Sequence, residues 1–69
     1  MDPEQVRETL TRIEREYREL PGLSLTERQI RRLWGLPHDL CEAALGELVR
    51  HDFLVETARG TFLRRTTPS

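Results

Sequence analysis

Apolar residues recur with a helical period over three segments of this chain and with a strand-like pattern near its end. In the first segment they follow one another at spacings of four, three, four and three, which places on one helix face Val6, Leu10, Ile13, Tyr17 and Leu20. Asp2 can cap this helix and Pro3 suits its first position, so we predict a helix over residues 3–19. The same spacing occurs in coiled coils, but two heptads are too few for one, and we expect the stripe to attach the helix to its own domain.

The second and third segments predict two short helices separated by a very tight turn. Thr26 and Gln29 have the spacing of a capping box, which starts a helix over residues 27–34. Its inward-facing side chains are expected to be those of Ile30, Leu33 and Trp34. Gly35 can end this helix in a left-handed conformation. The next helix, over residues 37–51, is expected to bury a stripe formed by Cys41, Ala44, Leu45, Leu48 and Val49.

Two β-prone runs near the end of the chain predict a hairpin. They cover residues 53–57 and 61–65 and are separated by a short turn that contains a glycine. An apolar strip at residues 23–25 is long enough for one short strand. The predicted fold class is therefore α+β and mostly helical, with a single domain over residues 1–65 and a disordered tail at residues 66–69.

The composition agrees with a small globular domain. Hydrophobic residues make up 36% of the chain and charged residues 33%, which is too apolar and too periodic for a disordered segment. No run approaches the roughly 18 apolar residues that span a bilayer, and the first residues do not form a secretory signal, so we expect no membrane association. Cys41 is the only cysteine and cannot form a disulfide within the chain, which favours a reducing, cytoplasmic location.

The charges are nearly balanced overall but unevenly distributed. The net charge is −1 for the whole chain, and all eleven basic residues are arginine. It is −2 over residues 1–25, −1 over residues 26–52 and +2 over residues 53–69. A nearly neutral protein has little long-range attraction for nucleic acid, so any such binding must depend on local basic patches.

The sequence offers no recognisable catalytic or cofactor chemistry. It contains no phosphate-cradling glycine loop, and its serines have no catalytic setting. His38 and Cys41 have a spacing that could hold a metal, but a structural zinc site needs about four ligands. We therefore expect no metal, no cofactor and no enzymatic activity, and we expect Cys41 to serve as a small buried hydrophobe.

The order of these elements resembles the winged-helix (winged helix-turn-helix) DNA-binding family over about residues 3–65. The resemblance is carried by the Thr26 cap, the turn at residues 34–37, the apolar positions that lead into Phe53 and Leu54, and the turn around Gly60. It implies that the strip at residues 23–25 pairs with the hairpin. Asp52 stands where a glycine is common in the family, but aspartate tolerates a left-handed conformation better than most residues do.

The resemblance also implies the function of a small transcriptional regulator that binds double-stranded DNA, as a dimer on two-fold sites. Phosphate contacts would come from Arg28, Arg31 and Arg32, and base or backbone contacts from His38 and Arg50. Arg59 would lie at the tip of the hairpin, with Arg64 and Arg65 beside it. Alternatively, the arginines of residues 27–34 form only a solvated helix face.

The exposed face of the third helix favours a second hypothesis. It combines carboxylates with small residues, namely Asp39, Glu42, Ala43, Gly46 and Glu47. Carboxylates repel phosphates, and a glycine inside a helix costs roughly 1 kcal/mol relative to alanine, which suggests that something approaches the backbone closely there. The domain would then be a protein-interaction or dimerisation module that does not bind DNA.

Overall fold

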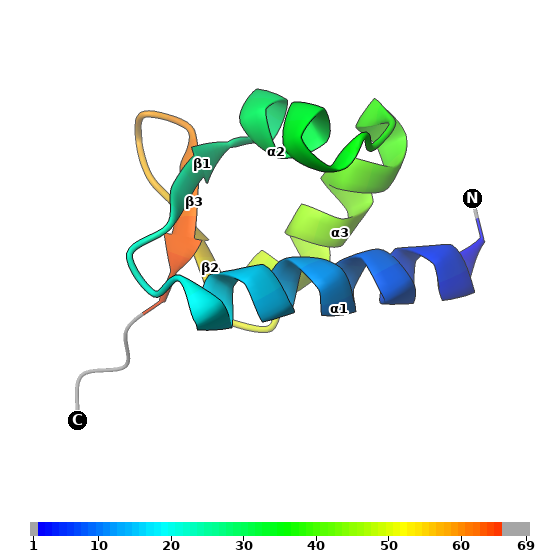
Figure 1. Ribbon diagram of the computed structural model, residues 1–69, viewed down its shortest axis with the longest axis horizontal. Helices are drawn as coiled ribbons and strands as arrows, with labels where there is room; N and C mark the ends of the chain where they lie inside the picture. The colour runs from blue at the N-terminus through cyan, green and yellow to red at the C-terminus, as the bar shows by residue number, and fades with distance from the viewer. Residues whose placement is uncertain (1, 66–69) are drawn as a thin grey trace.

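The computed structural model describes residues 2–65, which form three helices and a three-stranded antiparallel sheet (Figure 1). The elements in chain order are α1 (Pro3–Glu19), β1 (Ser24–Thr26), α2 (Glu27–Trp34), α3 (His38–Arg50), β2 (Leu54–Glu56) and β3 (Thr61–Arg64). The α+β, mostly helical fold class is thereby confirmed, and each predicted element is present within a residue or two of its predicted bounds. The tail predicted at residues 66–69 lies outside the described residues.

The capping interactions predicted at the helix ends are present in the structure. The Asp2 carboxylate accepts a hydrogen bond from the backbone N–H of Glu4 at 3.0 Å. Thr26 and Gln29 form the complete capping box, each side chain accepting from the other residue's backbone N–H. Gly35 ends α2 with a φ of 61°, a left-handed conformation that glycine adopts without steric cost. These contacts set the start of α1 and both ends of α2.

The sheet has the order β1-β3-β2, so the strip that follows α1 pairs with the hairpin. Leu25 lies opposite Phe62 in one antiparallel pair, and Val55 lies opposite Leu63 in the other. In Figure 1, α1 runs along the bottom of the molecule and α2 lies at the top, with α3 between them and the sheet at one side. The sheet therefore closes one end of a core that the three helices surround.

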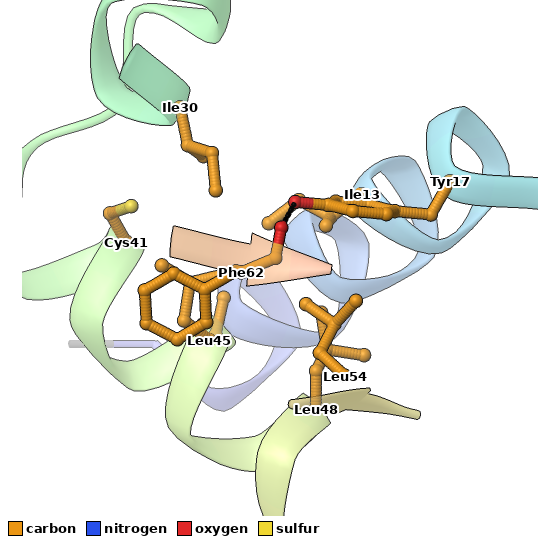
Figure 2. Packing of buried hydrophobic residues seen from close by; sticks show 9 residues of the cluster. Ile13, Tyr17, Ile30, Cys41, Leu45, Leu48, Leu54 and Phe62 are labelled. Carbon is orange, nitrogen blue, oxygen red and sulfur yellow. Dashed lines mark hydrogen bonds between the residues drawn. The ribbon is translucent and has the colours of Figure 1, made fainter. Parts of the chain in front are cut away.

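The core joins all of these layers (Figure 2). Its fully or almost fully buried members come from every helix and from both hairpin strands: Ile13, Tyr17, Ile30, Cys41, Ala44, Leu45, Leu48, Leu54 and Phe62. The hydroxyl of Tyr17 donates a 2.7 Å hydrogen bond to the backbone carbonyl of Phe62, which ties α1 to the central strand (Figure 2). Leu40, outside the predicted stripe of α3, is also buried.

Two predictions about inward-facing residues were wrong. Leu33 was expected to face the core but is 60% exposed, because the two-turn helix α2 contacts the core only along a narrow line through Ile30 and Trp34. The stripe on α1 is buried only in its middle, at Ile13 and Tyr17, whereas Leu20 at its end is 53% exposed. Leu20 follows the last residue of α1 and has left the helical backbone conformation (φ −125°, ψ 79°), so it does not continue the buried stripe.

Candidate nucleic-acid interface

The arginines of α2 gather on the side of this helix that faces away from the core. Arg28, Arg31 and Arg32 line one open hollow, as the helical spacing predicted. Arg28 and Arg32 are exposed, whereas Arg31 is half-buried. Two neighbouring guanidinium groups on an open surface can donate paired hydrogen bonds to phosphate oxygens.

The third arginine of this group is partly neutralised by a carboxylate. Arg31 Nε lies 3.7 Å from Glu27 Oε1, one turn earlier on α2. Both atoms are buried, and neither forms a well-directed hydrogen bond with any described residue. The attraction therefore acts through charge alone, and the freely available positive charge on α2 resides on Arg28 and Arg32.

His38, expected as a DNA contact, lies between two carboxylates. Its Nδ1 is 2.9 Å from Glu27 Oε1 on α2, and its Nε2 is 3.0 Å from Glu42 Oε2 on α3. The Nδ1 contact joins α3 to α2, whereas the Nε2 contact lies within α3, between residues four apart. The sequence carries no signal for the contact with Glu27, because this contact joins residues of two helices across a turn.

The exposed face of α3 is acidic and open. Asp39, Glu42, Ala43, Gly46, Glu47 and Arg50 line a broad hollow of about 530 Å³. Arg50, the only basic residue among them, lies 3.0 Å from Glu47 through its Nη1. No described atom outside the helix would come within 4 Å of a Cβ added at Gly46, so the close approach expected there is not made by the described residues.

A second acidic groove runs between α3 and the sheet. Its rim carries one carboxylate from each of three elements: Glu27, Glu42 and Glu56. Its floor is apolar and is formed by Leu45, Val49 and Phe62. The acidic surface therefore extends from the exposed face of α3 to the edge of the sheet.

The hairpin turn presents Arg59 at the same end of the sheet as the start of α2. Thr57 organises this turn: its hydroxyl accepts from the backbone N–H groups of Arg59 and Thr61, both at 3.3 Å. Gly60 follows with a φ of 83°. Since Thr26 lies opposite Thr61 in the sheet, the turn and the first residues of α2 are neighbours. Arg59 is exposed there.

Arg64 and Arg65 do not lie beside Arg59, contrary to the prediction. They stand at the other end of β3, near the residues that enter the hairpin. The Arg64 guanidinium lies 5.4 Å from the centre of the Phe53 ring, and Arg18 of α1 lies 5.7 Å from the same ring. Arg65 forms an ion pair of 2.8 Å with Asp52. Each strand residue advances the chain by about 3.3 Å, so β3 separates Arg64 and Arg65 from the turn that carries Arg59.

Comparisons with known proteins find no match to this chain among family models, curated proteins or solved structures. Among residues 2–65, no helix has the length and apolar character that crossing a membrane requires. Within the same residues, no group of three or more histidine, cysteine, aspartate or glutamate side chains is arranged to hold a metal ion.

Proposed function

We propose that this protein is a winged-helix domain that binds double-stranded DNA through α2 and the hairpin turn, and that it acts as a cytoplasmic transcriptional regulator. The observation that carries the proposal is the position of the free arginines. Arg28 and Arg32 are exposed on α2, and Arg59 is exposed on the turn, which adjoins the start of α2 at Thr26. The order of three helices and a β1-β3-β2 sheet is compatible with the winged-helix architecture.

The charges of α3 shape how such a complex would form. Its exposed face carries Asp39, Glu42 and Glu47, and inserting it deeply into the major groove would bring these carboxylates near phosphates. Binding would therefore rely mainly on backbone contacts from α2 and the turn, with little reading of bases. This predicts weak affinity, limited sequence preference and a strong dependence on salt.

The salt dependence of binding provides the first test. Three phosphate contacts predict that the logarithm of the association constant falls with the logarithm of salt concentration with a slope of about −3. Fluorescence anisotropy with labelled duplexes of mixed sequence measures this slope. Absence of binding at low salt and high micromolar protein contradicts the proposal.

A pair of matched double variants locates the binding surface. Replacing Arg28 and Arg32 with alanine is expected to reduce the magnitude of the slope by about 2 and to weaken binding to all duplexes alike. The control replaces Arg12 and Arg15 of α1, which removes the same charge from exposed positions on another helix. If both variants lose affinity equally, binding reflects net charge and not the α2 surface.

The acidic face of α3 supports a second candidate function, the binding of a cationic protein segment. The favouring observation is the open hollow around Gly46, which is lined by carboxylates and accessible to a partner backbone. Such a partner would supply lysine or arginine side chains to Asp39 and Glu42. This surface differs from the arginines of α2, so the two functions can be tested separately.

A short lysine-rich peptide serves as the probe for this second function. Calorimetric titration is expected to show binding that weakens when Asp39 is replaced with asparagine and Glu42 with glutamine. Gly46→Trp should block the hollow, whereas Gly46→Ala should leave it open. The control replaces Glu14 and Glu16 of α1 with glutamine and should leave the peptide affinity unchanged. If the α3 changes also leave the affinity unchanged, this candidate is rejected.

A further inference from the structure

The first half of α1 carries apolar side chains that the rest of the chain covers only partly. Val6 and Leu10 are half-buried, while Ile13 and Tyr17 further along the same stripe are fully buried. Leu10 packs against the core, but Val6 does not belong to the residues that do so. In Figure 1 the first turns of α1 extend beyond α3 toward the N-terminus. An apolar helix face is therefore left without a partner within residues 2–65.

This face borders a groove between α1 and α3 of about 470 Å³. Pro3, Val6, Arg7 and Leu10 line it from α1, and Ala43 and Glu47 line it from α3. The four α1 residues have the spacing i, i+3, i+4 and i+7, which places them on one side of the helix. The small side chain of Ala43 leaves room for another helix to approach.

We infer that this groove is a homodimer interface, in which the first half of α1 from a second copy packs antiparallel to α1 across a two-fold axis. A two-fold interface uses the same patch on both copies, so it must be complementary to itself. The apolar residues meet this condition, because Val6 and Leu10 of each copy would cover those of the other. Packing of this kind resembles the seam of a short antiparallel coiled coil.

The charges of the groove support a second copy as its occupant. Arg7 and Glu47 carry opposite charges on its two walls. A two-fold axis between antiparallel α1 helices brings Arg7 of each copy toward Glu47 of the other, which gives two complementary pairs. Among the described residues Arg7 makes no ion pair, whereas Glu47 is already near Arg50 and His51 on its own helix. Arg7 is thus the group that gains a partner on association.

Sedimentation equilibrium provides the direct test. We expect a reversible dimer with a dissociation constant in the micromolar range, because the groove is small compared with obligate interfaces. Val6→Glu would place a carboxylate in the apolar seam and is expected to raise this constant about tenfold or more. Val6 lies outside the core, so this variant should keep its helical circular-dichroism spectrum. The control Leu33→Glu changes an exposed leucine on α2 and should leave the dimer unchanged.

Mixing two charge variants distinguishes an intermolecular contact from an intramolecular one. Arg7→Glu alone and Glu47→Arg alone each place like charges together in their own homodimers, and each should dimerise more weakly than wild type. An equimolar mixture of the two restores both oppositely charged pairs across the axis and should recover dimer formation. A contact within one chain gives no recovery on mixing.

A wild-type protein that stays monomeric at several hundred micromolar overturns this inference, as does a mixture that fails to recover association. Dimer formation that survives Val6→Glu also overturns it, since the seam then lies elsewhere. The readout is molecular mass without nucleic acid. Failure of DNA binding and failure of dimerisation can therefore be told apart.

Discussion

At the scale of single residues, Tyr17 shows how one side chain connects distant parts of the chain. It is fully buried, and its hydroxyl reaches the Phe62 carbonyl in the central strand, 45 residues away in sequence. Burial raises the pKa of Tyr17 to about 12 from its ordinary value of 10.0, because the phenolate loses its hydration. The neutral phenol is thus the form that the folded state stabilises.

The raised pKa of Tyr17 predicts a loss of stability in alkaline solution. Between pH 10 and pH 12 the unfolded chain releases a proton that the folded chain retains, so the free energy of unfolding falls as the pH rises. The loss reaches about 2–3 kcal/mol at most. Burial also raises the pKa of Cys41 to about 11, helped by the charge of Glu27 and opposed by that of Arg31. The Cys41 thiol would therefore add its own alkaline dependence, so urea unfolding should be measured in a Cys41→Ala background.

Tyr17→Phe in that background should remove most of the dependence between pH 10 and pH 12. At neutral pH the same change should cost about 1–3 kcal/mol, because it leaves the buried Phe62 carbonyl without its hydrogen bond. An unchanged alkaline slope would mean that Tyr17 does not cause the loss.

Gly46 predicts a stabilising substitution. It lies inside α3 with open space at the position of a Cβ and without a positive φ. Gly46→Ala should therefore raise the free energy of unfolding by about 0.5–1 kcal/mol, because alanine loses less backbone entropy on folding. Thermal unfolding measures this gain, and Gly35→Ala is the opposing control, since its φ of 61° strains any side chain.

At the scale of the elements, the junction between α3 and β2 depends on Asp52. Its φ of 61° is left-handed. This agrees with the expectation from the winged-helix resemblance, in which a glycine is common at this position. The backbone N–H of Phe53 donates to Leu48 O at 2.9 Å, and that of Asp52 donates to Val49 O at 3.0 Å, the two bonds of a Schellman motif. This turn directs the chain from the helix into the hairpin.

Substitutions at Asp52 should separate backbone strain from charge. Asp52→Ala is expected to destabilise the protein by about 1–2 kcal/mol, because alanine tolerates this conformation poorly and the ion pair with Arg65 is lost. Asp52→Gly relieves the strain while losing the same pair, and should stay within about 0.5 kcal/mol of wild type. Arg65→Ala reports the contribution of the exposed pair alone. Equal losses for the alanine and glycine variants would show that the charge, not the backbone, matters.

At the scale of the whole molecule, opposite charges occupy different surfaces. The arginines of the proposed DNA surface lie on α2 and the hairpin turn, while carboxylates cover the face of α3 and the groove beside the sheet. The apolar groove between α1 and α3 borders the acidic face, since Ala43 and Glu47 line both. The proposed DNA surface and the proposed dimer seam therefore share no lining residue, so a dimer could still bind DNA.

The proposed dimer predicts that thermal stability depends on protein concentration. Association of folded chains stabilises them by mass action, so the melting temperature should rise when the concentration increases from well below to well above the dissociation constant. Val6→Glu should melt at the same temperature over that range. A wild-type melting temperature that is independent of concentration would contradict the dimer.

Local chemistry made the elements predictable from the sequence. The caps at Asp2 and Thr26, the glycine at residue 35 and the periodicity of the apolar residues each act within a few residues, so helix bounds followed closely. The cluster of arginines on α2 was predictable for the same reason, because helical spacing alone places them together.

The sequence by itself thus determined the elements, their ends and the charges on each helix face. Only the tertiary structure decided which of these faces meet. It left Leu33 exposed, brought Arg65 to Asp52 and Arg64 to the Phe53 ring, and placed His38 beside Glu27. These outcomes depend on contacts between residues far apart in the chain, and such contacts follow from the packing of whole elements and not from local spacing.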